Sequence, residues 1–341
     1  MAHGATIGTL VLTRADVKRL LGMADCVAAV ERVFLAHANG GSIAPGVLGT
    51  HVERGGFHVK TAGVASRGGD SHAVFAAKVN ANFPDNPGQR GLPTIQGVIV
   101  LFDAIDGRVL AVLDSIEITS VRTAAATAVA ARHLARSDSS TVTVCGCGEQ
   151  GRSQLRALTC VCPLREVWAF DVDPARADAY AREMHTELGI PVRVARELGD
   201  ETRASDIWVT CTPAHRWFLG RAHVAPGAFI AAVGADNPEK QEIEPALLTE
   251  STVVADVVEQ CASIGELHHA LDAGVMQRAD VHAQLADVVS GRKPGRRSPE
   301  EVIIFDSTGT ALEDVAAAML VYERAMGLGE GTMIDLGRVT P

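Results

Sequence analysis

Three glycines with a defined spacing form the clearest chemical motif of the sequence. They are Gly146, Gly148 and Gly151, in the stretch TVTVCGCGEQG at residues 141–151. The β-branched residues before them predict a strand, and EQGRSQLRALTC predicts a helix that begins within the motif. In this setting the first glycine permits a tight turn, the second lets the backbone approach a pyrophosphate, and the third allows close helix–strand packing. The motif therefore predicts a loop that binds the phosphates of a dinucleotide.

The residues around this loop extend the predicted cofactor site. Glu149 and Gln150 stand at the start of the expected helix, whose free N–H groups and positive dipole end favour phosphates. The next predicted strand, EVWAFD, ends at Asp171, where a carboxylate would accept a hydrogen bond from the adenosine ribose and repel a 2′-phosphate. Because Val172 and Asp173 supply no arginine for such a phosphate, we expect NAD(H) rather than NADP(H). In the alternative interpretation, Asp171 only caps the turn that follows.

Four cysteines near the motif offer a competing interpretation, a zinc site. Cys145, Cys147, Cys160 and Cys162 form two CxC pairs, and four thiolates can bind zinc tetrahedrally. The predicted helix between the pairs has about ten residues, which places the pairs about 15 Å apart at a rise of 1.5 Å per residue. One zinc ion cannot span that distance. We therefore expect small buried side chains and no metal.

Length and composition limit the class of protein. The 341 residues suggest two domains, and 47% hydrophobic with 21% charged residues is typical of a globular enzyme. The formal net charge of −10 disfavours nucleic acid or a membrane surface as a partner. No signal peptide and no apolar run of the length that a membrane span needs are recognised. The odd number of seven cysteines argues against a disulfide framework, so we expect a cytoplasmic protein.

The first part of the chain predicts a mixed domain dominated by a sheet. Residues 13–39 keep a helical period, with Thr13 as the expected N-cap and an acid three residues later. Residues 50–114 form short β-rich runs separated by Gly, Pro, Asn and Asp, and Asp106-Gly107 predicts a hairpin turn. An alanine-rich helix is expected at 116–136. This part is predicted to be an α+β domain.

From residue 141 the predicted strands and helices alternate. Such alternation is typical of βαβ units around a parallel sheet, so the fold class is α/β, with a doubly wound Rossmann domain beside the α+β domain. The strands after the first two βα pairs are expected at VRVA, DIWVTCT, AFIAAVG, TVVAD and EVIIFD.

Several longer stretches resemble the ornithine cyclodeaminase/μ-crystallin family. They are KVNANFPDNPGQRGLPTIQGVIVLFDAIDGRVLAVLDS, EITSVRTAAATAVAARHLA, the glycine loop and GADNPEKQEIEPALL, and the resemblance runs from about residue 10 to 325. It implies a homodimer of two-domain subunits. Residues 1–117 with 308–341 would form the substrate-binding and dimerisation domain, and residues 118–307 the dinucleotide-binding domain. The family includes ornithine cyclodeaminase, alanine dehydrogenase, imino-acid reductases and the binding protein μ-crystallin, so its name alone does not select the activity.

The resemblance also implies roles for three charged residues. Lys78, in AAKVNANFP, matches the family's substrate lysine, and Arg122, in TSVRTAAAT, matches its carboxylate-binding arginine. Asp236, in VGADNP, matches the acidic residue beside the substrate amine and follows a strand of the predicted parallel sheet. The structural alternatives are a lysine at a strand end, an arginine on a helix surface and a turn-forming aspartate.

Two departures from the family pattern bear on the reaction. Most relatives carry a Pro-x-Arg in the loop after the first helices, whereas this chain has Ala44-Pro45-Gly46-Val47. The ornithine enzymes place a catalytic Glu on the next strand, whereas this chain has GFHVKTAG, with Lys60 and no acid. Lys60 is expected to replace the missing cation. The missing acid counts against cyclisation of ornithine, which needs a base for the distal amine.

We therefore expect an NADH-dependent enzyme that reduces a small imino acid or, in reverse, dehydrogenates an amino acid. Lys60 and Arg122 would bind the substrate carboxylate, and Lys78 and Asp236 would be the catalytic residues at the nitrogen. Two alternatives stay open: ornithine cyclodeaminase, and a binding protein like μ-crystallin that has no turnover. The side chain of the substrate is not predicted.

Overall fold

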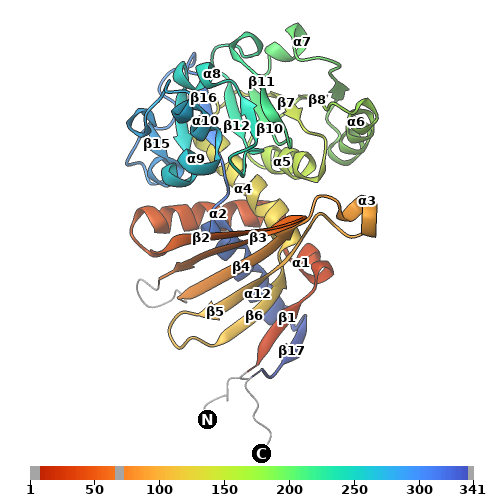
Figure 1. The fold of residues 1–341 in the computed structure, drawn as a ribbon, viewed down its shortest axis with the longest axis vertical. Coiled ribbons are helices and arrows are strands. Elements are labelled where there is room, and N and C mark those ends of the chain that lie inside the picture. The colour runs from red at the N-terminus through yellow and green to blue at the C-terminus, as the bar shows by residue number, and fades with distance from the viewer. Residues whose placement is uncertain (1–7, 66–72, 337–341) are drawn as a thin grey trace, which may run out of the picture. The chain divides into compact units, whose positions relative to one another are not determined.

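The computed structural model describes residues 8–65 and 73–336. The chain divides into two compact units, Met1–Arg122 with Thr310–Pro341, and Thr123–Gly309 (Figure 1). The helix α4 (Ile116–Leu134) contains the first boundary. Among the described helices, none has both the length and the apolar character that crossing a bilayer requires.

The first unit is built on a seven-stranded mixed sheet. Its order is β17-β1-β6-β5-β4-β3-β2, with β1 parallel to β6 and the other pairs antiparallel. The strands are β1 (Thr9–Leu12), β2 (Ser42–Val52), β3 (Gly55–Val64), β4 (Val74–Asn82), β5 (Ile95–Asp103), β6 (Val109–Asp114) and β17 (Thr332–Ile334). The helix α12 (Ala311–Leu328) packs on β3, β4 and β5 and against α2 (Met23–Ala38). One face of the sheet is thereby covered by helices.

The helix expected at 13–39 is in fact two helices. Thr13 caps α1 (Arg14–Leu20) through a capping box with Asp16, as predicted. The chain then leaves the helical conformation at Leu21 and Gly22, and α2 begins after them. Both linker residues are extended, and glycine has a low preference for helix interiors, so the continuous apolar period concealed the break.

Two further local expectations concern the strands of this sheet. The predicted turn at Asp106-Gly107 joins β5 to β6, and Gly107 has a φ of +79°. The segment 44–47, expected in a loop, lies within β2, where the pairing with β3 shifts between Ile43 and Gly46. Pro45 lies at this irregularity, which is one of the few places where an edge strand accepts proline. Helix α3 (Asn86–Arg90) follows β4.

The second unit confirms the predicted doubly wound α/β fold. Its eight strands run in the order β15-β14-β16-β12-β10-β7-β8-β9, and all the pairs are parallel. They are β7 (Thr141–Cys145), β8 (Glu166–Phe170), β9 (Val192–Val194), β10 (Ile207–Thr210), β12 (Phe229–Ala232), β14 (Thr252–Ala255), β15 (Ala283–Gln284) and β16 (Ile303–Asp306). Every residue of β10, β12 and β16 is buried, as expected for a parallel sheet that is covered on both faces.

The chain order of these strands identifies the edge where a ligand is expected. From β7 the chain proceeds outward through β8 and β9, and then returns to β10 on the other side of β7. Ligands of open α/β sheets bind at the carboxyl ends of the strands beside such a reversal. The helices of this unit are α5 (Glu149–Thr159), α6 (Pro174–Leu188), α7 (Asp200–Arg203), α8 (Pro245–Thr249), α9 (Val258–Ile264), α10 (Glu266–Asp272) and α11 (Leu285–Val289). A small parallel pair, β11 (His215–Leu219) with β13 (Gln241–Ile243), was not predicted.

Candidate active site

The glycine loop connects β7 to α5 at the carboxyl edge of the second unit's sheet. Gly146 has a φ of +105°, and a Cβ there would lie 2.8 Å from the carbonyl oxygen of Cys211. A Cβ on Gly151 would collide with the carbonyl oxygen of Gly146. Both positions therefore require glycine, one for its backbone conformation and the other for close packing.

Gly148 differs from the other two glycines because the space that a side chain would occupy is empty. It is the N-cap of α5, makes no side-chain capping bond, and has no atom within 4 Å of the position of a Cβ. Glu149 and Gln150 form the first turn, and the side-chain Nε2 of Gln150 is buried without a hydrogen-bond partner. An open glycine at a helix N-terminus fits the pyrophosphate of a dinucleotide. The backbone N–H of Glu149, rather than its carboxylate, is suited to a phosphate.

Asp171 connects the glycine loop to the turn after β8. Its Oδ2 accepts from the backbone N–H of Cys147 at 2.9 Å, and its Oδ1 accepts from that of Asp173 at 3.0 Å. The bond from Asp173 is the turn interaction that the alternative interpretation of Asp171 expects. A carboxylate has about four lone-pair sites, so these two bonds leave capacity for the hydroxyls of a ribose.

The cysteines near the loop are all free thiols. Cys145 and Cys147 are buried, Cys162 is half-buried and Cys160 is exposed beyond α5. Burial raises the pKa of Cys147 to about 12 and that of Cys162 to about 11. In the part of the chain that the structure describes, no three His, Cys, Asp or Glu residues gather as possible metal ligands.

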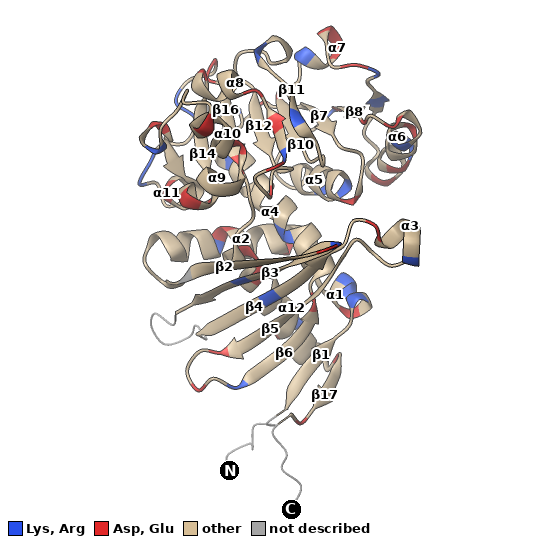
Figure 2. Ribbon diagram, viewed as in Figure 1, with Lys and Arg blue, Asp and Glu red and all other residues tan. Residues whose placement is uncertain are grey.

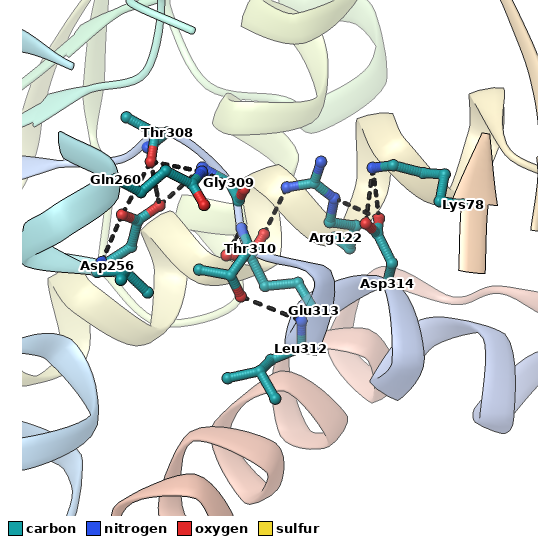
Figure 3. A network of polar contacts seen from close by, with 11 residues as sticks. Lys78, Arg122, Asp256, Gln260, Thr308, Gly309, Thr310, Leu312, Glu313 and Asp314 are labelled. Carbon is teal, nitrogen blue, oxygen red and sulfur yellow. Dashed lines mark hydrogen bonds and ion pairs between the residues drawn. The ribbon is translucent and has the colours of Figure 1, made fainter. Parts of the chain in front are cut away.

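The first unit contains a buried cluster of four charged side chains. Figure 3 shows the carboxylate of Asp314 between Lys78 and Arg122. Lys78 Nζ lies 2.8 Å from Oδ1 and 2.7 Å from Oδ2, and Arg122 Nε donates to Oδ1 at 2.8 Å. Arg122 Nη1 also donates to Glu313 Oε2 at 2.6 Å. Lys78 and Arg122 are each only 4% exposed, so this is an internal site and neither is a surface residue.

The start of α12 explains why two acids meet these cations. Thr310 is the N-cap, and its hydroxyl accepts from the N–H of Leu312 at 3.2 Å. Its own N–H donates to Glu313 Oε1 at 3.2 Å, which completes a capping box. Acids in the first turn also interact favourably with the helix dipole. Glu313 therefore caps the helix with one oxygen and pairs with Arg122 through the other.

The cluster shifts the pKa values of its members. Burial, followed by Arg122 and Lys60, lowers the pKa of Lys78 to about 7, although Asp314 acts in the opposite direction. Burial alone would raise the pKa of Asp314, but Arg122 and Lys78 lower it. Burial opposes the charge of Arg122, whereas Asp314 and Glu313 raise its pKa. A lysine with a pKa near neutrality can gain and lose a proton at physiological pH.

Lys60 lies beside Lys78 in the sheet. The register of β3 and β4 pairs them directly, so the two side chains project from the same face. Lys60 is half-buried, and its charge lowers the pKa of both Lys78 and Asp314. Lys60, Lys78 and Arg122, which lie on three different elements, are thus brought together within the first unit.

Asp236 belongs to the second unit. It is exposed in the loop after β12, and its Oδ1 accepts from Lys240 Nζ at 2.7 Å. Because β12 neighbours β10, and β10 neighbours β7, this loop and the glycine loop lie at the same edge of the sheet. The dinucleotide residues and Asp236 therefore share one edge.

Comparison with known proteins agrees with these features. The profile of the ornithine cyclodeaminase/mu-crystallin family matches residues 8–329, and the chain belongs to this family. An alanine dehydrogenase of Archaeoglobus fulgidus is 37% identical over 97% of this chain and 99% of its own length. With this relative, an iminosuccinate reductase of Paracoccus denitrificans and a Delta(1)-pyrroline-2-carboxylate reductase of Bacillus cereus place the chain among the NAD-dependent oxidoreductases that act on amino or imino groups.

Two solved structures are similar over nearly the full length of both chains. An archaeal alanine dehydrogenase dimer with bound NAD has a TM-score of 0.91 and 36% identity, and covers 96% of this chain and 99% of its own. The Thermococcus litoralis Delta(1)-pyrroline-2-carboxylate reductase, in complex with NADH and L-proline, has a TM-score of 0.89 and 31% identity. It covers 95% of this chain and 99% of its own.

Replacing Gly148 with valine tests the glycine loop. The branched side chain would fill the open side on which the pyrophosphate is expected, without meeting a protein atom. We expect Gly148→Val to lose NADH binding in a fluorescence titration and to keep its melting temperature. Retained affinity would mean that this loop does not bind the cofactor.

Replacing Asp314 with asparagine tests the charge cluster. An adjacent anion favours the ammonium form of Lys78, so its removal should lower the pKa of Lys78 below about 7. If Lys78 donates a proton during reduction, kcat/KM falls as pH rises through this pKa, and in Asp314→Asn the fall should begin at lower pH. Glu313→Gln is the matched control, because it removes a charge from the same turn that contacts Arg122 instead. An equal shift in both variants would contradict the assignment to Asp314.

Proposed function

We propose that the protein reduces a small α-imino acid with NADH, or dehydrogenates the corresponding amino acid in reverse. The observation that carries this proposal is the buried cluster of Lys78, Arg122 and Asp314, which offers cations for a carboxylate and a lysine with a pKa near 7. The names of the relatives support it, since they are an alanine dehydrogenase and reductases of imino acids.

The charged residues of the first unit would bind and protonate the substrate. Arg122 engages its acids through Nε and Nη1, and we assign its guanidinium group, together with Lys60, to the substrate carboxylate. Lys78 would hold the proton at the imine nitrogen. Asp236 would orient that nitrogen or pass on its proton. Bound NADH supplies the hydride that the α-carbon receives.

The cofactor and substrate roles divide between two segments of the chain. We assign the dinucleotide to residues 118–307, through Gly146, Gly148, Gly151, the first turn of α5 and Asp171. Residues 1–117 with 308–341 would bind the substrate and form the dimer. The compact units, with boundaries after Arg122 and Gly309, support this division. The seven free thiols are consistent with a cytoplasmic location.

One assay separates this function from its alternatives. The purified protein is incubated with NADH and a panel of 2-oxo acids with ammonia or methylamine, cyclic imines and iminosuccinate, and the absorbance of reduced nicotinamide is followed. A reductase consumes NADH with every turnover. Release of ammonia from ornithine without net change in NADH would establish a cyclodeaminase instead. Tight NADH binding with no turnover of any compound would favour a binding protein.

The outer face of the first unit's sheet supports a homodimer. Leu48, Val79 and Val98 lie in one cross-strand row with Val59, on the face opposite Lys78, and all three are exposed. In Figure 2 the strands of this sheet are mostly tan, with few charged positions. An exposed apolar patch of this kind typically marks an interface. We therefore propose that a second copy of the chain covers it.

Replacing Leu48 and Val98 with aspartate tests the dimer. Leu48 is 64% exposed in the single chain, so the folded subunit should tolerate the change. The buried charges would oppose association, and we expect the molecular mass by light scattering to fall to that of a monomer at micromolar concentration. Ile105→Asp, on the turn after β5, is the exposed control and should leave the dimer intact. A wild-type protein that is already monomeric would refute the proposal.

Replacing Lys60 with alanine tests whether Lys60 takes the place of the arginine that is missing from the Pro-x-Arg position. A charge-assisted hydrogen bond contributes roughly 1.5–3 kcal/mol, so KM for the imino acid should rise about 10- to 100-fold. The affinity for NADH should be nearly unchanged. A lower melting temperature with wild-type KM would show instead that Lys60 has a structural role.

A further inference from the structure

Two loops leave the carboxyl edge of the parallel sheet beside the glycine loop. They are residues 211–214, after β10, and residues 233–237, after β12, and the second carries Asp236. In the register of the sheet, Cys145 lies opposite Thr210 and Thr210 lies opposite Ala232. The two loops therefore emerge next to each other, and the loop after β10 lies between the loop after β12 and the predicted phosphate-binding loop.

One buried carboxylate, that of Glu242 on β13, bonds to both loops. Its Oε1 accepts from the backbone N–H of Thr212 at 2.6 Å and from the hydroxyl of Thr212 at 2.7 Å. Its Oε2 accepts from the backbone N–H of Gly234 at 2.9 Å. The side chain is fully buried, and these bonds come from neutral donors. Backbone hydrogen bonds of the sheet hold Cys211 and Val233, the first residues of the two loops, and the carboxylate joins the loops beyond these residues.

The packing around Glu242 is tight on both sides. A Cβ on Gly234 would collide with the carboxylate of Glu242. On the other side, a Cβ on Gly146 would lie 3.1 Å from Cγ2 of Thr212, so Thr212 packs directly against the glycine loop. A movement of the Glu242 carboxylate would therefore displace the loop of Asp236 and remove the support beside Gly146.

Two more buried carboxylates hold Glu242 in place. Glu266 accepts from the backbone N–H of Glu242 at 2.8 Å and from that of Ile243 at 3.1 Å. Asp306, at the end of β16, accepts from the N–H groups of Glu266 at 3.2 Å and Leu267 at 2.9 Å. Each acid thus fixes the backbone that carries the next. Asp306, Glu266 and Glu242 thus form a chain of contacts from β16 of the sheet to the loop of Asp236.

We infer that Glu242 is a positioning residue for the reaction, which acts by holding the loop of Asp236 through Gly234 and the loop beside the phosphates through Thr212. This inference rests on the proposed function, in which Asp236 acts at the substrate nitrogen. A carboxylate is required because the three bonds need two acceptor oxygens. A glutamine would supply only one and would direct its amide N–H₂ group at a donor.

The first measurement is independent of catalysis. Hydrogen–deuterium exchange, followed by mass spectrometry, compares wild type with Glu242→Gln and with the control Glu239→Gln, which removes an exposed charge from the same segment. We expect faster exchange at residues 211–214 and 233–237 in Glu242→Gln alone. Unchanged exchange there would overturn the inference.

The second measurement is a double-mutant cycle with Asp236→Asn. We expect Glu242→Gln to lower kcat about 10- to 100-fold, because small displacements of a catalytic group have effects of this size, and to change KM for the imino acid less than threefold. If Glu242 acts through Asp236, this loss should largely disappear in the Asp236→Asn background. Losses that multiply would show a general structural role and overturn the inference.

Two further outcomes are covered: a Glu242→Gln variant that does not fold, and a wild-type protein without turnover. If Glu242→Gln does not fold, Gly234→Ala displaces the same carboxylate sterically, and Glu242→Asp in that background should restore part of kcat because the shorter side chain makes room. A wild-type protein that turns over no compound of the panel would refute the proposed function separately. Hydrogen exchange alone would then decide whether Glu242 holds the two loops.

Discussion

The carboxylate of Asp314 lies between two buried cations, and the candidate substrate site depends on this arrangement. Without a nearby anion, burial would strongly disfavour charge on both Lys78 and Arg122. With it, Arg122 stays charged and Lys78 keeps a pKa near 7. The proton chemistry of the site thus follows from the position of the first turn of α12, which its capping box holds in place. The capping of α12 therefore determines both where its acids lie and which charges the two cations carry.

The second unit uses buried acids differently, as acceptors for backbone N–H groups. Glu242, Glu266 and Asp306 each accept two or more such bonds, and Asp256 accepts from Thr308 at 2.8 Å and Gly309 at 2.7 Å. Burial raises the pKa of Asp306 to about 7, while the N–H donors lower it. These acids satisfy backbone N–H groups of β13, of the first turn of α10 and of the loops after β10, β12 and β16.

Local patterns predicted much of this protein. The alternation of strands and helices identified the parallel sheet, and the glycine spacing located the loop between β7 and α5. Glu313 and Asp314 were missed because they lie more than 190 positions from Arg122, although Thr310 and Glu313 form a recognisable capping box. Pairing at this separation depends on tertiary packing, which no local window contains. The break in the first helix was hidden for the opposite reason, because its apolar period continued across Gly22.

The register of β3 and β4 has a consequence for how the site is formed. Nine pairs, from Gly56 opposite Asn82 to Val64 opposite Val74, keep these strands in one alignment. Because successive side chains alternate between faces, a slip by one residue would exchange Lys78 with Val79. The same slip would bury an apolar residue among the acids and expose an ammonium group on the apolar face. The alignment of β3 with β4 therefore decides two features at once: which residue of β4 faces the acids of α12, and which residues form the apolar surface on the other face.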